Sequence, residues 1–169
     1  EFVDIDNDGD LDTFINRGDG TFQFFENTGT EFEASYTERT GGANPLDGVN
    51  VGSSGNLTFA DIDNDGDIDV FIGSLAGTVR FFENTGSVAS PTFVERTGAN
   101  NPLDGVGTVS LSLPGLVDID NDGDFDAFVG DHDSGTILAF ENTGNSTSAT
   151  FTVTAATATR TPISVKLKP

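Results

Sequence analysis

Aspartate occupies every second position in three short stretches of this chain. The stretches read DIDNDGDLD at residues 4–12, DIDNDGDID at 61–69 and DIDNDGDFD at 118–126, with a spacing of 57 residues. In each stretch the aspartates fall at positions 1, 3, 5, 7 and 9, and a glycine stands at position 6. Carboxylates gathered this densely offer only oxygen ligands, which suit a hard divalent cation.

The spacing also matches the first half of an EF-hand loop, in which side chains at positions 1, 3 and 5 and a carbonyl at position 7 converge on calcium. Here the loop closes early, because an aspartate at position 9 stands in place of a more distant glutamate. We therefore predict one Ca²⁺ in each loop, three in total. The predicted metal ligands are Asp4, Asp6, Asp8, Asp10, Asp12, Asp61, Asp63, Asp65, Asp67, Asp69, Asp118, Asp120, Asp122, Asp124 and Asp126.

Electrostatics favour bound cations independently of this pattern. Two carboxylates about 4 Å apart repel by roughly 4 kcal/mol at an effective dielectric constant near 20, which few marginally stable domains could tolerate in three places. A divalent cation converts the repulsion into attraction. We expect Ile5 and Leu11, which lie between aspartates, to point away from the ion into the core and tie the loop to its flanking strands.

The 57-residue period extends well beyond the acidic loops. FFENTG at 24–29 recurs at 81–86 and, as AFENTG, at 139–144. ERTGGANPLDGV at 38–49 is matched by ERTGANNPLDGV at 95–106, whereas the third copy has diverged to TATRTPISV. We therefore expect three units: repeat 1 at 1–55 with a truncated first strand, repeat 2 at 56–112, and repeat 3 at 113–169 with a diverged C-terminal end.

Each unit has the pattern of four short strands. In the second unit these are residues 56–62, 69–74, 78–84 and 92–96, and Gly, Asn, Asp and Pro fill the gaps. The second strand is apolar almost throughout in each copy (TFIN, VFIG and AFVG), which predicts a strand covered on both faces. The expected fold is all-β, with three four-stranded repeats resembling β-propeller blades, either as an open array or as part of a propeller.

These residues resemble the FG-GAP/VCBS type of repeat, which builds the propellers of integrin α-subunits and recurs in many large bacterial surface proteins. The resemblance rests on D-x-D-x-D-G-x-x-D in each copy, followed by FIG or FVG in the second and third copies and then by FFENTG or AFENTG. It covers nearly the whole chain and weakens after Phe151. It implies a four-stranded blade per repeat and a calcium ion between the first two strands. It implies no single activity, since such repeats serve in adhesion, carbohydrate binding and scaffolding.

The composition excludes several classes of function. The chain has 28 acidic and 7 basic residues and a net charge of −21, so nucleic acid and anionic membrane surfaces are unsuitable partners. Cysteine is absent, and no apolar run is long enough to insert into a membrane. No nucleophile with its base and no phosphate-binding loop stands out, so we predict a protein that is not an enzyme. A secreted chain whose signal has been removed, or an excised fragment, would have this composition.

The two ends of the chain suggest how it assembles. The third acidic loop is preceded by VSLSLPGLVDID, and the C-terminal VKLKP joined to the N-terminal EFVDID gives a similar sequence. Since propellers of the family close about seven blades, three repeats leave two open faces. We expect the C-terminal segment to complete repeat 1 of a neighbouring subunit, giving a head-to-tail filament or surface array. A closed ring, or a longer natural chain, would give the same boundary.

The predicted function is that of a calcium-stabilised structural or adhesive protein outside the cell or on its surface. The alternative is a propeller module of a larger secreted protein that binds a glycan or protein ligand. A lectin would be expected to expose aromatic side chains, whereas this chain has one tyrosine and no tryptophan.

Several smaller motifs favour structural roles. Arg17, Gly18 and Asp19 form an RGD tripeptide at a predicted hairpin tip, but the equivalent turns of the other copies lack it. Asn56 and Asn145 fit the glycosylation sequon, and we expect them to be ordinary turn residues.

Two further groups contain titratable side chains. Asp131, His132 and Asp133 are expected to form an exposed polar turn, because the other copies offer no partner chemistry there. The glutamates of the ENTG segments are expected to pair with backbone donors or with the arginines of ERTG, that is, Glu26, Glu83 and Glu141 with Arg39 and Arg96.

Overall fold

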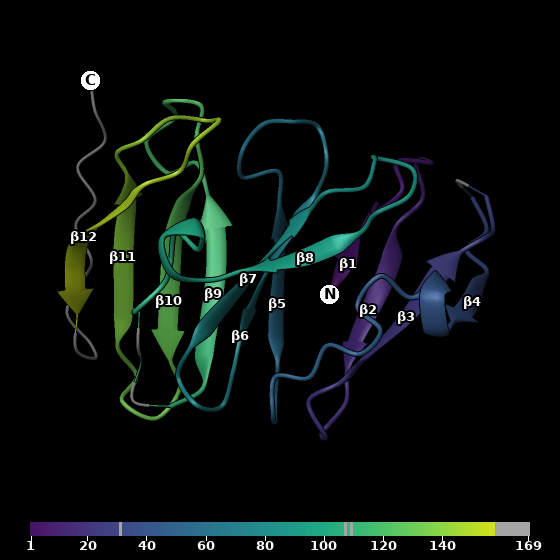
Figure 1. Ribbon diagram of the computed structural model, residues 1–169, viewed down its shortest axis with the longest axis horizontal. Coiled ribbons are helices and arrows are strands. Elements are labelled where there is room, and N and C mark those ends of the chain that lie inside the picture. Colours follow the sequence, from purple (N-terminus) through teal and green to yellow (C-terminus); the bar gives the residue numbers. More distant parts are fainter. Residues whose placement is uncertain (31, 107, 109, 158–169) are drawn as a thin grey trace.

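The computed structural model describes residues 1–30, 32–106, 108 and 110–157. Its strands form three separate four-stranded antiparallel sheets, each a meander in chain order (Figure 1). The first sheet contains β1 (Phe2–Val3), β2 (Asp12–Asn16), β3 (Phe22–Asn27) and β4 (Tyr36–Arg39). The second contains β5 (Asn56–Ala60), β6 (Asp69–Gly73), β7 (Val79–Asn84) and β8 (Phe93–Arg96). The third contains β9 (Ser112–Val117), β10 (Asp126–Asp131), β11 (Ile137–Asn142) and β12 (Phe151–Thr157).

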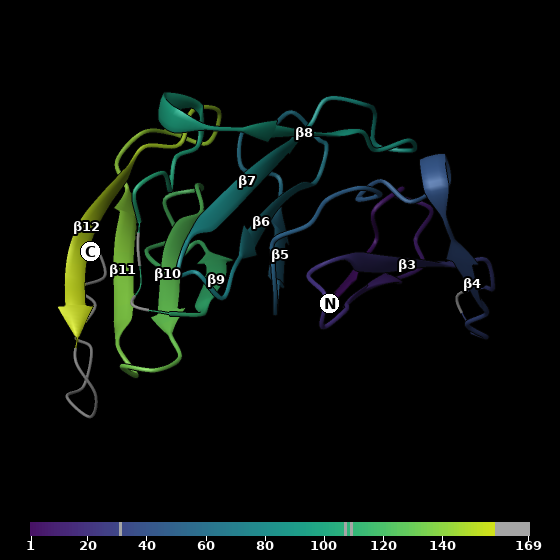
Figure 2. The ribbon, with the colours of Figure 1, turned by 60° about the horizontal axis from the view of Figure 1, so that its bottom comes forward.

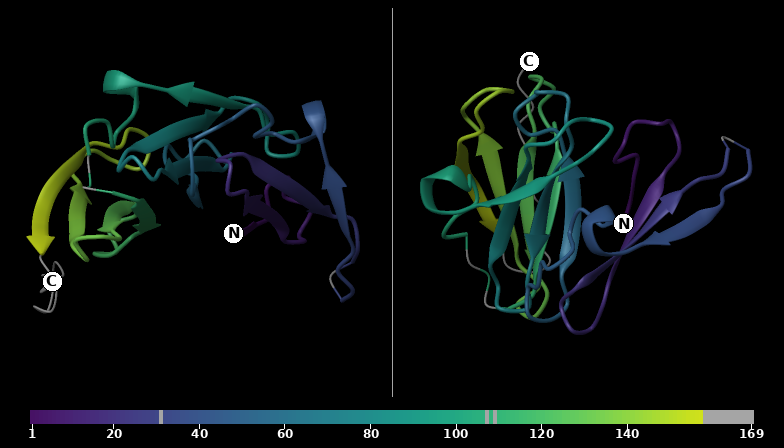
Figure 3. Two further views of the ribbon diagram at one scale, coloured as in Figure 1. Left: turned by 90° about the horizontal axis from the view of Figure 1, so that it is seen from below. Right: turned by 45° about the vertical axis from the view of Figure 1, so that its right-hand side comes forward.

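We call the three sheets the first, middle and third blades. Figure 2 shows them one after another along the molecule, and the left view of Figure 3 shows them fanned into an arc. The outermost strands β4, β8 and β12 lie along the convex side of this arc. The all-β fold of blade-like repeats is therefore confirmed, and the four strands expected in the second repeat begin and end within two residues of their expected bounds.

Two apolar cores fill the seams between neighbouring blades. The first core joins Phe14 and Phe24 of the first blade to Val70 and Ile72 of the middle blade. The second core joins Phe71 of the middle blade and its neighbours to the third blade. Strand β6 supplies side chains to both cores, and all five of its residues are buried. This confirms that the apolar second strand of the middle repeat is covered on both faces.

The first blade departs from that expectation. Ile15 in β2 is 46% exposed, whereas its counterpart Ile72 in β6 is fully buried. The difference arises because the middle blade has a sheet on each side, while the first blade packs against only one sheet in the described part of the chain. The prediction of a second strand covered on both faces is therefore wrong for the first repeat.

The two segments with the sequence NPLDG cover one end of each seam and add a leucine to its apolar core. Each follows a short 3₁₀ turn, η1 (Gly41–Ala43) or η2 (Gly98–Asn100). Leu46 enters the first core and Leu103 the second, with 1% and 0% exposure. The buried Asn101 holds this turn by donating to the Val79 carbonyl and accepting from the Leu103 amide. The corresponding segment of the third repeat, TATRTPISV, extends beyond the described residues.

Backbone contacts close the other end of each seam. The Thr108 amide donates to the Gly77 carbonyl at 2.9 Å, and the Ser112 amide donates to the Ser74 carbonyl at 3.1 Å. Gly77 has a φ of +82°, and a Cβ there would lie 2.2 Å from the Thr108 carbonyl oxygen. Only glycine fits such a close approach in this conformation. No helix within the described ranges has the length and apolar character needed to cross a membrane.

Candidate metal centre

The three acidic loops connect the first two strands of each blade, and their backbone turns twice into the left-handed region. The first such turn is at position 4 of the loop, with φ of 57°, 55° and 62° at Asn7, Asn64 and Asn121. The second is at the glycine of position 6, with φ between 94° and 96°. Asparagine tolerates this conformation better than most residues with a side chain. The predicted site residues do not include this asparagine, although its presence at position 4 of all three loops is a signal for such a turn.

This backbone brings the first three aspartates of each loop together. One carboxylate oxygen from each lies within 4.8 Å of the other two, and the groups are Asp4, Asp6 and Asp8; Asp61, Asp63 and Asp65; and Asp118, Asp120 and Asp122. The first aspartate is fixed by the loop itself. In the second loop the Asp61 carboxylate accepts hydrogen bonds from the amides of Asp65 and Gly66, at 3.1 and 3.0 Å.

The second loop shows that this cluster has the donor set for a cation. Oδ1 of Asp63 is buried and has no hydrogen-bond partner. Burial, and then the neighbouring charge of Asp65, raise the pKa of Asp63 above its usual value. Asp6 is perturbed in the same direction for the same reasons. A buried oxygen without a donor is costly unless something compensates it, and a hard divalent cation bound by these carboxylates would do so.

The aspartates at position 7 lie outside the groups of three carboxylates. These are Asp10, Asp67 and Asp124. The amides of Asp10 and Asp67 donate at 2.9 Å to the aspartates at position 5, which braces the turn. Burial and the charge of Asp122 raise the pKa of Asp124 to about 6. Their predicted role as ligands stays a prediction.

The aspartates at position 9 begin the second strand of each blade and are almost fully buried. Asp69 is 1% exposed, and its two oxygens accept the amide of Asn84 at 2.7 Å and the amide of Ile62 at 3.3 Å. Burial raises its pKa to about 7, although both amide donors act in the opposite direction. Asp12 and Asp126 make the equivalent pair of contacts in their own blades. We call each of these residues the clamp aspartate of its loop, because it ties the loop to the third strand.

The clamp continues through a buried asparagine of the ENTG segment. Oδ1 of Asn84 accepts the amides of Gly86 at 3.1 Å and Thr92 at 2.9 Å. Asn27 and Asn142 make the same pair of contacts in the other blades. One chain of hydrogen bonds thus runs from the acidic loop to the turn before the fourth strand. The asparagine recurs in every ENTG segment, which is the sequence signal for this position, and it was missing from the predicted functional residues.

The apolar residues inside each loop point into different seams. At position 2, Ile5 and Ile62 are 3% and 5% exposed and enter the cores shared with the following blade. At position 8, Ile68 packs against the core shared with the preceding blade. Leu11, the position 8 residue of the first loop, is 54% exposed. The prediction for Ile5 is confirmed, and that for Leu11 is wrong, because the described residues include no sheet that covers this side chain.

The glutamates of ENTG pair as expected in two blades. Glu26 and Arg39 form two hydrogen bonds of 2.8 Å, and Glu83 and Arg96 form two of 2.9 Å. The paired arginine lowers the pKa of Glu26. No such pair is found for Glu141 within the described residues, because the third repeat carries no arginine at the equivalent place before residue 157.

The hairpin tips carry the remaining motifs. Arg17, Gly18 and Asp19 are exposed between β2 and β3, and the Asp19 carboxylate is occupied by the amide and hydroxyl of Thr21. His132 and Asp133 form an exposed pair at 3.0 Å, as expected of a polar turn.

Three other residues in these motifs differ in their surroundings. Asp131 is only 4% exposed, so the expectation of an exposed turn is wrong for this residue. It accepts the amides of Asp133 and Ser134 at the end of β10, which holds the turn in place. Asn145 lies in an exposed turn, whereas Asn56 is half-buried at the start of β5.

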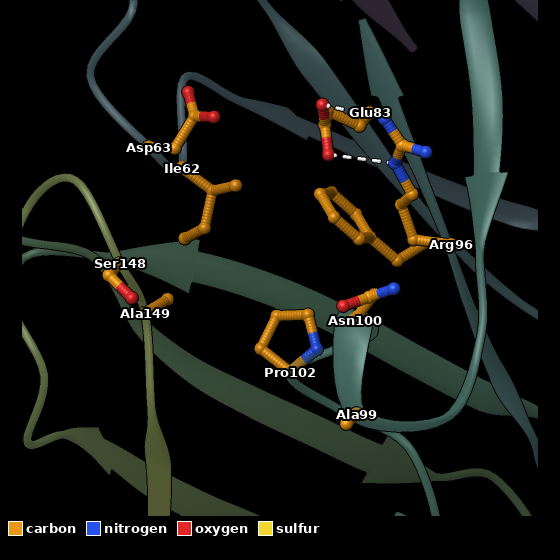
Figure 4. Close-up of a pocket in the computed structure, with 10 residues that line it drawn as sticks. Ile62, Asp63, Glu83, Arg96, Ala99, Asn100, Pro102, Ser148 and Ala149 are labelled. Atoms are coloured by element: carbon orange, nitrogen blue, oxygen red, sulfur yellow. Dashed lines mark hydrogen bonds and ion pairs between the residues drawn. The ribbon is translucent and has the colours of Figure 1, made fainter.

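A pocket of about 420 Å³ lies in the second seam, beside the carboxylate cluster of the second loop (Figure 4). Asp63 and the Glu83–Arg96 pair stand on its middle-blade side, and Ser148 and Ala149 of the third repeat stand opposite. A pocket of about 230 Å³ occupies the equivalent place in the first seam, lined by Asp6 and Glu26 among others. The two pockets lie at equivalent places, so a pocket beside the acidic loop recurs with the repeat.

Comparison with known families agrees with the geometry. A family described as FG-GAP-like repeat matches the chain twice, at residues 4–72 and 61–129. Each match begins at an acidic loop and ends in the second strand of the following blade. No curated protein matches the chain.

Proposed function

The chain belongs to the FG-GAP-like repeat family, and from that premise we propose that it is a calcium-stabilised structural or adhesive repeat protein that acts outside the cell. Repeats of this family form structural or binding modules that are not enzymes and are typically extracellular. The observation that carries the proposal is the cluster of three carboxylates in every blade, which in the middle blade includes a buried oxygen without a hydrogen-bond partner.

The proposed role of the ion is mechanical. The carboxylates at positions 1, 3 and 5 of each loop would hold it, and bound calcium would supply the positive charge that cancels their repulsion. Other residues of the loop connect the fixed loop to the rest of the blade. The residue at position 2 packs into one seam, and the aspartate at position 9 accepts a hydrogen bond from the third strand. Fixing one loop therefore stiffens a blade and its junction with the next blade.

Chelation tests the calcium proposal. We expect removal of calcium to lower the melting temperature, because one ion at 100 times its dissociation constant adds about 2.7 kcal/mol of stability. Differential scanning calorimetry with and without a chelator measures the change. The substitution Asp63→Asn removes one charge from the middle cluster, and Asp133→Asn is the matched control in an exposed turn. A melting temperature that does not respond to the chelator would contradict the proposal.

We also propose that copies of the chain associate head to tail. The sequence similarity between the joined termini and the segment before the third loop supports this arrangement. The C-terminal residues 165–169 lie outside the described part of the chain. Their deletion is expected to abolish association if they complete the first sheet of a neighbour. Electron micrographs of the calcium-loaded chain would separate filaments, rings and isolated particles.

The seam pocket favours a second function, the binding of a glycan or a protein ligand by a propeller module. Its lining combines the Asn100 amide and the Ser148 hydroxyl with apolar surface from Phe81 and Pro102. Such a combination of convergent polar groups and apolar walls is typical of ligand sites. Titration of simple sugars against the chain and against Asn100→Ala would test it. Equal or absent binding by both proteins would leave calcium-dependent scaffolding as the better account.

A further inference from the structure

We propose that the pocket in the second seam binds a short neutral or basic peptide segment, and that the equivalent pocket in the first seam does not. This assignment rests on the second function proposed above, ligand binding at the seam, and specifies both the class of ligand and the seam. We call the two cavities the first-seam pocket and the second-seam pocket. Both walls of the second-seam pocket belong to the described residues, one to the middle repeat and one to the third (Figure 4).

The two pockets differ in size. The second-seam pocket has a volume of about 420 Å³, and the first-seam pocket has a volume of about 230 Å³. Pockets that bind small ligands usually have volumes of about 300–1,000 Å³. The second-seam pocket falls within this range, whereas the first-seam pocket lies below it.

One wall differs by a proline. Pro91 lines the first-seam pocket at the place where Ala149 lines the second-seam pocket. The two residues are equivalent, because each directly precedes the threonine whose amide donates to the buried asparagine of its ENTG segment, at 2.9 Å in both blades. Alanine has a smaller side chain than proline and keeps a backbone N–H that proline lacks. The change therefore leaves more room and adds a hydrogen-bond donor to a lining residue.

The opposite wall differs by a side-chain amide. Asn100 lines the second-seam pocket, whereas Ala43, which lies 57 residues earlier, lines the first-seam pocket. Among the described residues, neither the side-chain amide of Asn100 nor the hydroxyl of Ser148 has a hydrogen-bond partner. Figure 4 shows these two side chains on different walls of the pocket. The second-seam pocket thus offers an amide and a hydroxyl that the fold itself does not use.

These free groups match the main chain of a peptide. The side-chain amide of asparagine carries a donor and an acceptor in one plane, as a peptide group does, so the two can exchange a pair of hydrogen bonds. The hydroxyl of Ser148 can both donate and accept, and the N–H of Ala149 can donate to a neighbouring carbonyl. Phe81 and Pro102 add apolar surface beside these groups. A few convergent polar groups beside apolar walls are the usual composition of a ligand site.

A sugar is a poorer match than a peptide. A sugar site would be expected to present an exposed aromatic ring, on which one face of the sugar packs. Among the described residues that line the second-seam pocket, Phe81 is the one aromatic residue, and it is only 4% exposed. The pocket therefore has free hydrogen-bonding groups but little aromatic surface, which favours a peptide.

The charges around the pocket determine which peptides it accepts. Asp63 and Glu83 line the pocket, and Arg96, the one cation among the described lining residues, is already paired with Glu83 at 2.9 Å. The lining therefore carries a net negative charge, and the whole chain carries −21. An acidic peptide is repelled by this field, whereas a neutral or basic peptide is not.

NMR titration of the ¹⁵N-labelled, calcium-loaded chain tests the ligand class. The probes are three capped tripeptides, acetyl-Ala-Gln-Ala-amide, acetyl-Ala-Lys-Ala-amide and acetyl-Ala-Glu-Ala-amide, and the sugars glucose and galactose, all at millimolar concentration. We expect the neutral and basic peptides to shift the side-chain amide signals of Asn100 and the backbone amide signal of Ala149. The acidic peptide should bind at least about tenfold more weakly, and the sugars should leave these signals unchanged.

Exchange of residues between the two pockets tests the assignment to the second seam. Asn100→Ala combined with Ala149→Pro gives the second-seam pocket the residues of the first, and we expect peptide binding to weaken by about tenfold or more. Ala43→Asn combined with Pro91→Ala is the reciprocal variant, and we expect it to bind a second peptide. Each new residue already occupies the equivalent place in the other seam, so both variants should fold. Melting temperatures in calcium check that they do.

The possible failures have different consequences. Shifts caused by glucose or galactose but by no peptide would overturn the ligand class and leave ligand binding at the seam in place. Peptide binding that survives the exchange at the second seam, or a reciprocal variant without a second site, would overturn the assignment of the seam. If no probe binds the wild-type chain, the second function and this inference both fail. The calcium proposal is not affected by that result, because the response of the melting temperature to chelator tests it separately.

Discussion

The middle and first blades share a sequence pattern but not an environment. In β6 every residue is buried, including Ile72, whereas the equivalent residue of β2, Ile15, faces solvent. The clamp aspartate, its two amide partners and the buried asparagine are nevertheless the same in both blades. The comparison shows that a blade contains two structural systems. Hydrogen bonds organise it internally, and its apolar faces acquire their role only from neighbouring blades.

Truncation of the paired isoleucines should give the largest contrast between these blades. We expect Ile72→Ala to lower the free energy of unfolding by about 4 kcal/mol, because it opens a cavity in the first seam. Ile15→Ala should change it by less than about 0.5 kcal/mol in the monomer, since the side chain is exposed. Urea denaturation at low protein concentration measures both values. Equal losses would show that the outer face of the first blade is buried in solution.

Removal of the clamp aspartates should abolish the contrast. We expect Asp69→Ala and Asp12→Ala each to lower the free energy of unfolding by about 3 kcal/mol. Each substitution leaves two buried backbone amides without a hydrogen-bond acceptor. Denaturation in the presence of a chelator keeps cation binding out of the comparison. A much smaller loss for Asp12→Ala would mean that the hydrogen-bond system also depends on the neighbouring blades.

The pH dependence of stability should differ between the two clamps. Burial raises the pKa of Asp12 to about 6 and that of Asp69 to about 7. Between the unfolded pKa near 3.8 and these raised values, the two carboxyl groups bind protons in the folded chain but not in the unfolded chain. The stability of the chain in chelator should therefore fall as pH rises from about 4 to about 7. One such group contributes at most about 1.4 kcal/mol per pH unit.

Melting temperatures recorded against pH check this expectation. Asp69→Asn should flatten the upper part of the profile, and Asp12→Asn should flatten only the part below about pH 6. With calcium present the trend should reverse, because protons compete with the ion for carboxylates. A chelated chain whose stability rises with pH over this range would contradict the sign.

The smallest expected effect concerns the surface ion pairs. Glu83→Gln should cost no more than about 1 kcal/mol, because the Glu83–Arg96 pair is partly exposed to solvent. Glu141→Gln in the third blade should change stability by less than about 0.5 kcal/mol. Thermal melts of both variants would measure the difference. A large loss for Glu141→Gln would reveal a partner for this glutamate beyond the described residues.

Much of the carboxylate cluster could be predicted from the sequence because its determinants are local. Positions 1, 3 and 5 converge through a tight turn, and the glycine at position 6 adopts the positive φ that the turn requires. The hydrogen bonds of the clamp aspartate could not be predicted from local sequence in this way. Asp69 meets the Asn84 amide, which lies 15 residues away, only because the sheet places their strands side by side.

The sequence by itself determined the repeat, its four strands and the convergence of three carboxylates in each loop. These features follow from local patterns of apolar residues, turn residues and charge spacing. Only the tertiary structure decided which apolar residues are buried. Ile15 and Ile72 have the same local pattern, and so do Leu11 and Ile68. Burial of an apolar face depends on the sheet that lies against it, and no local pattern records whether that sheet is present.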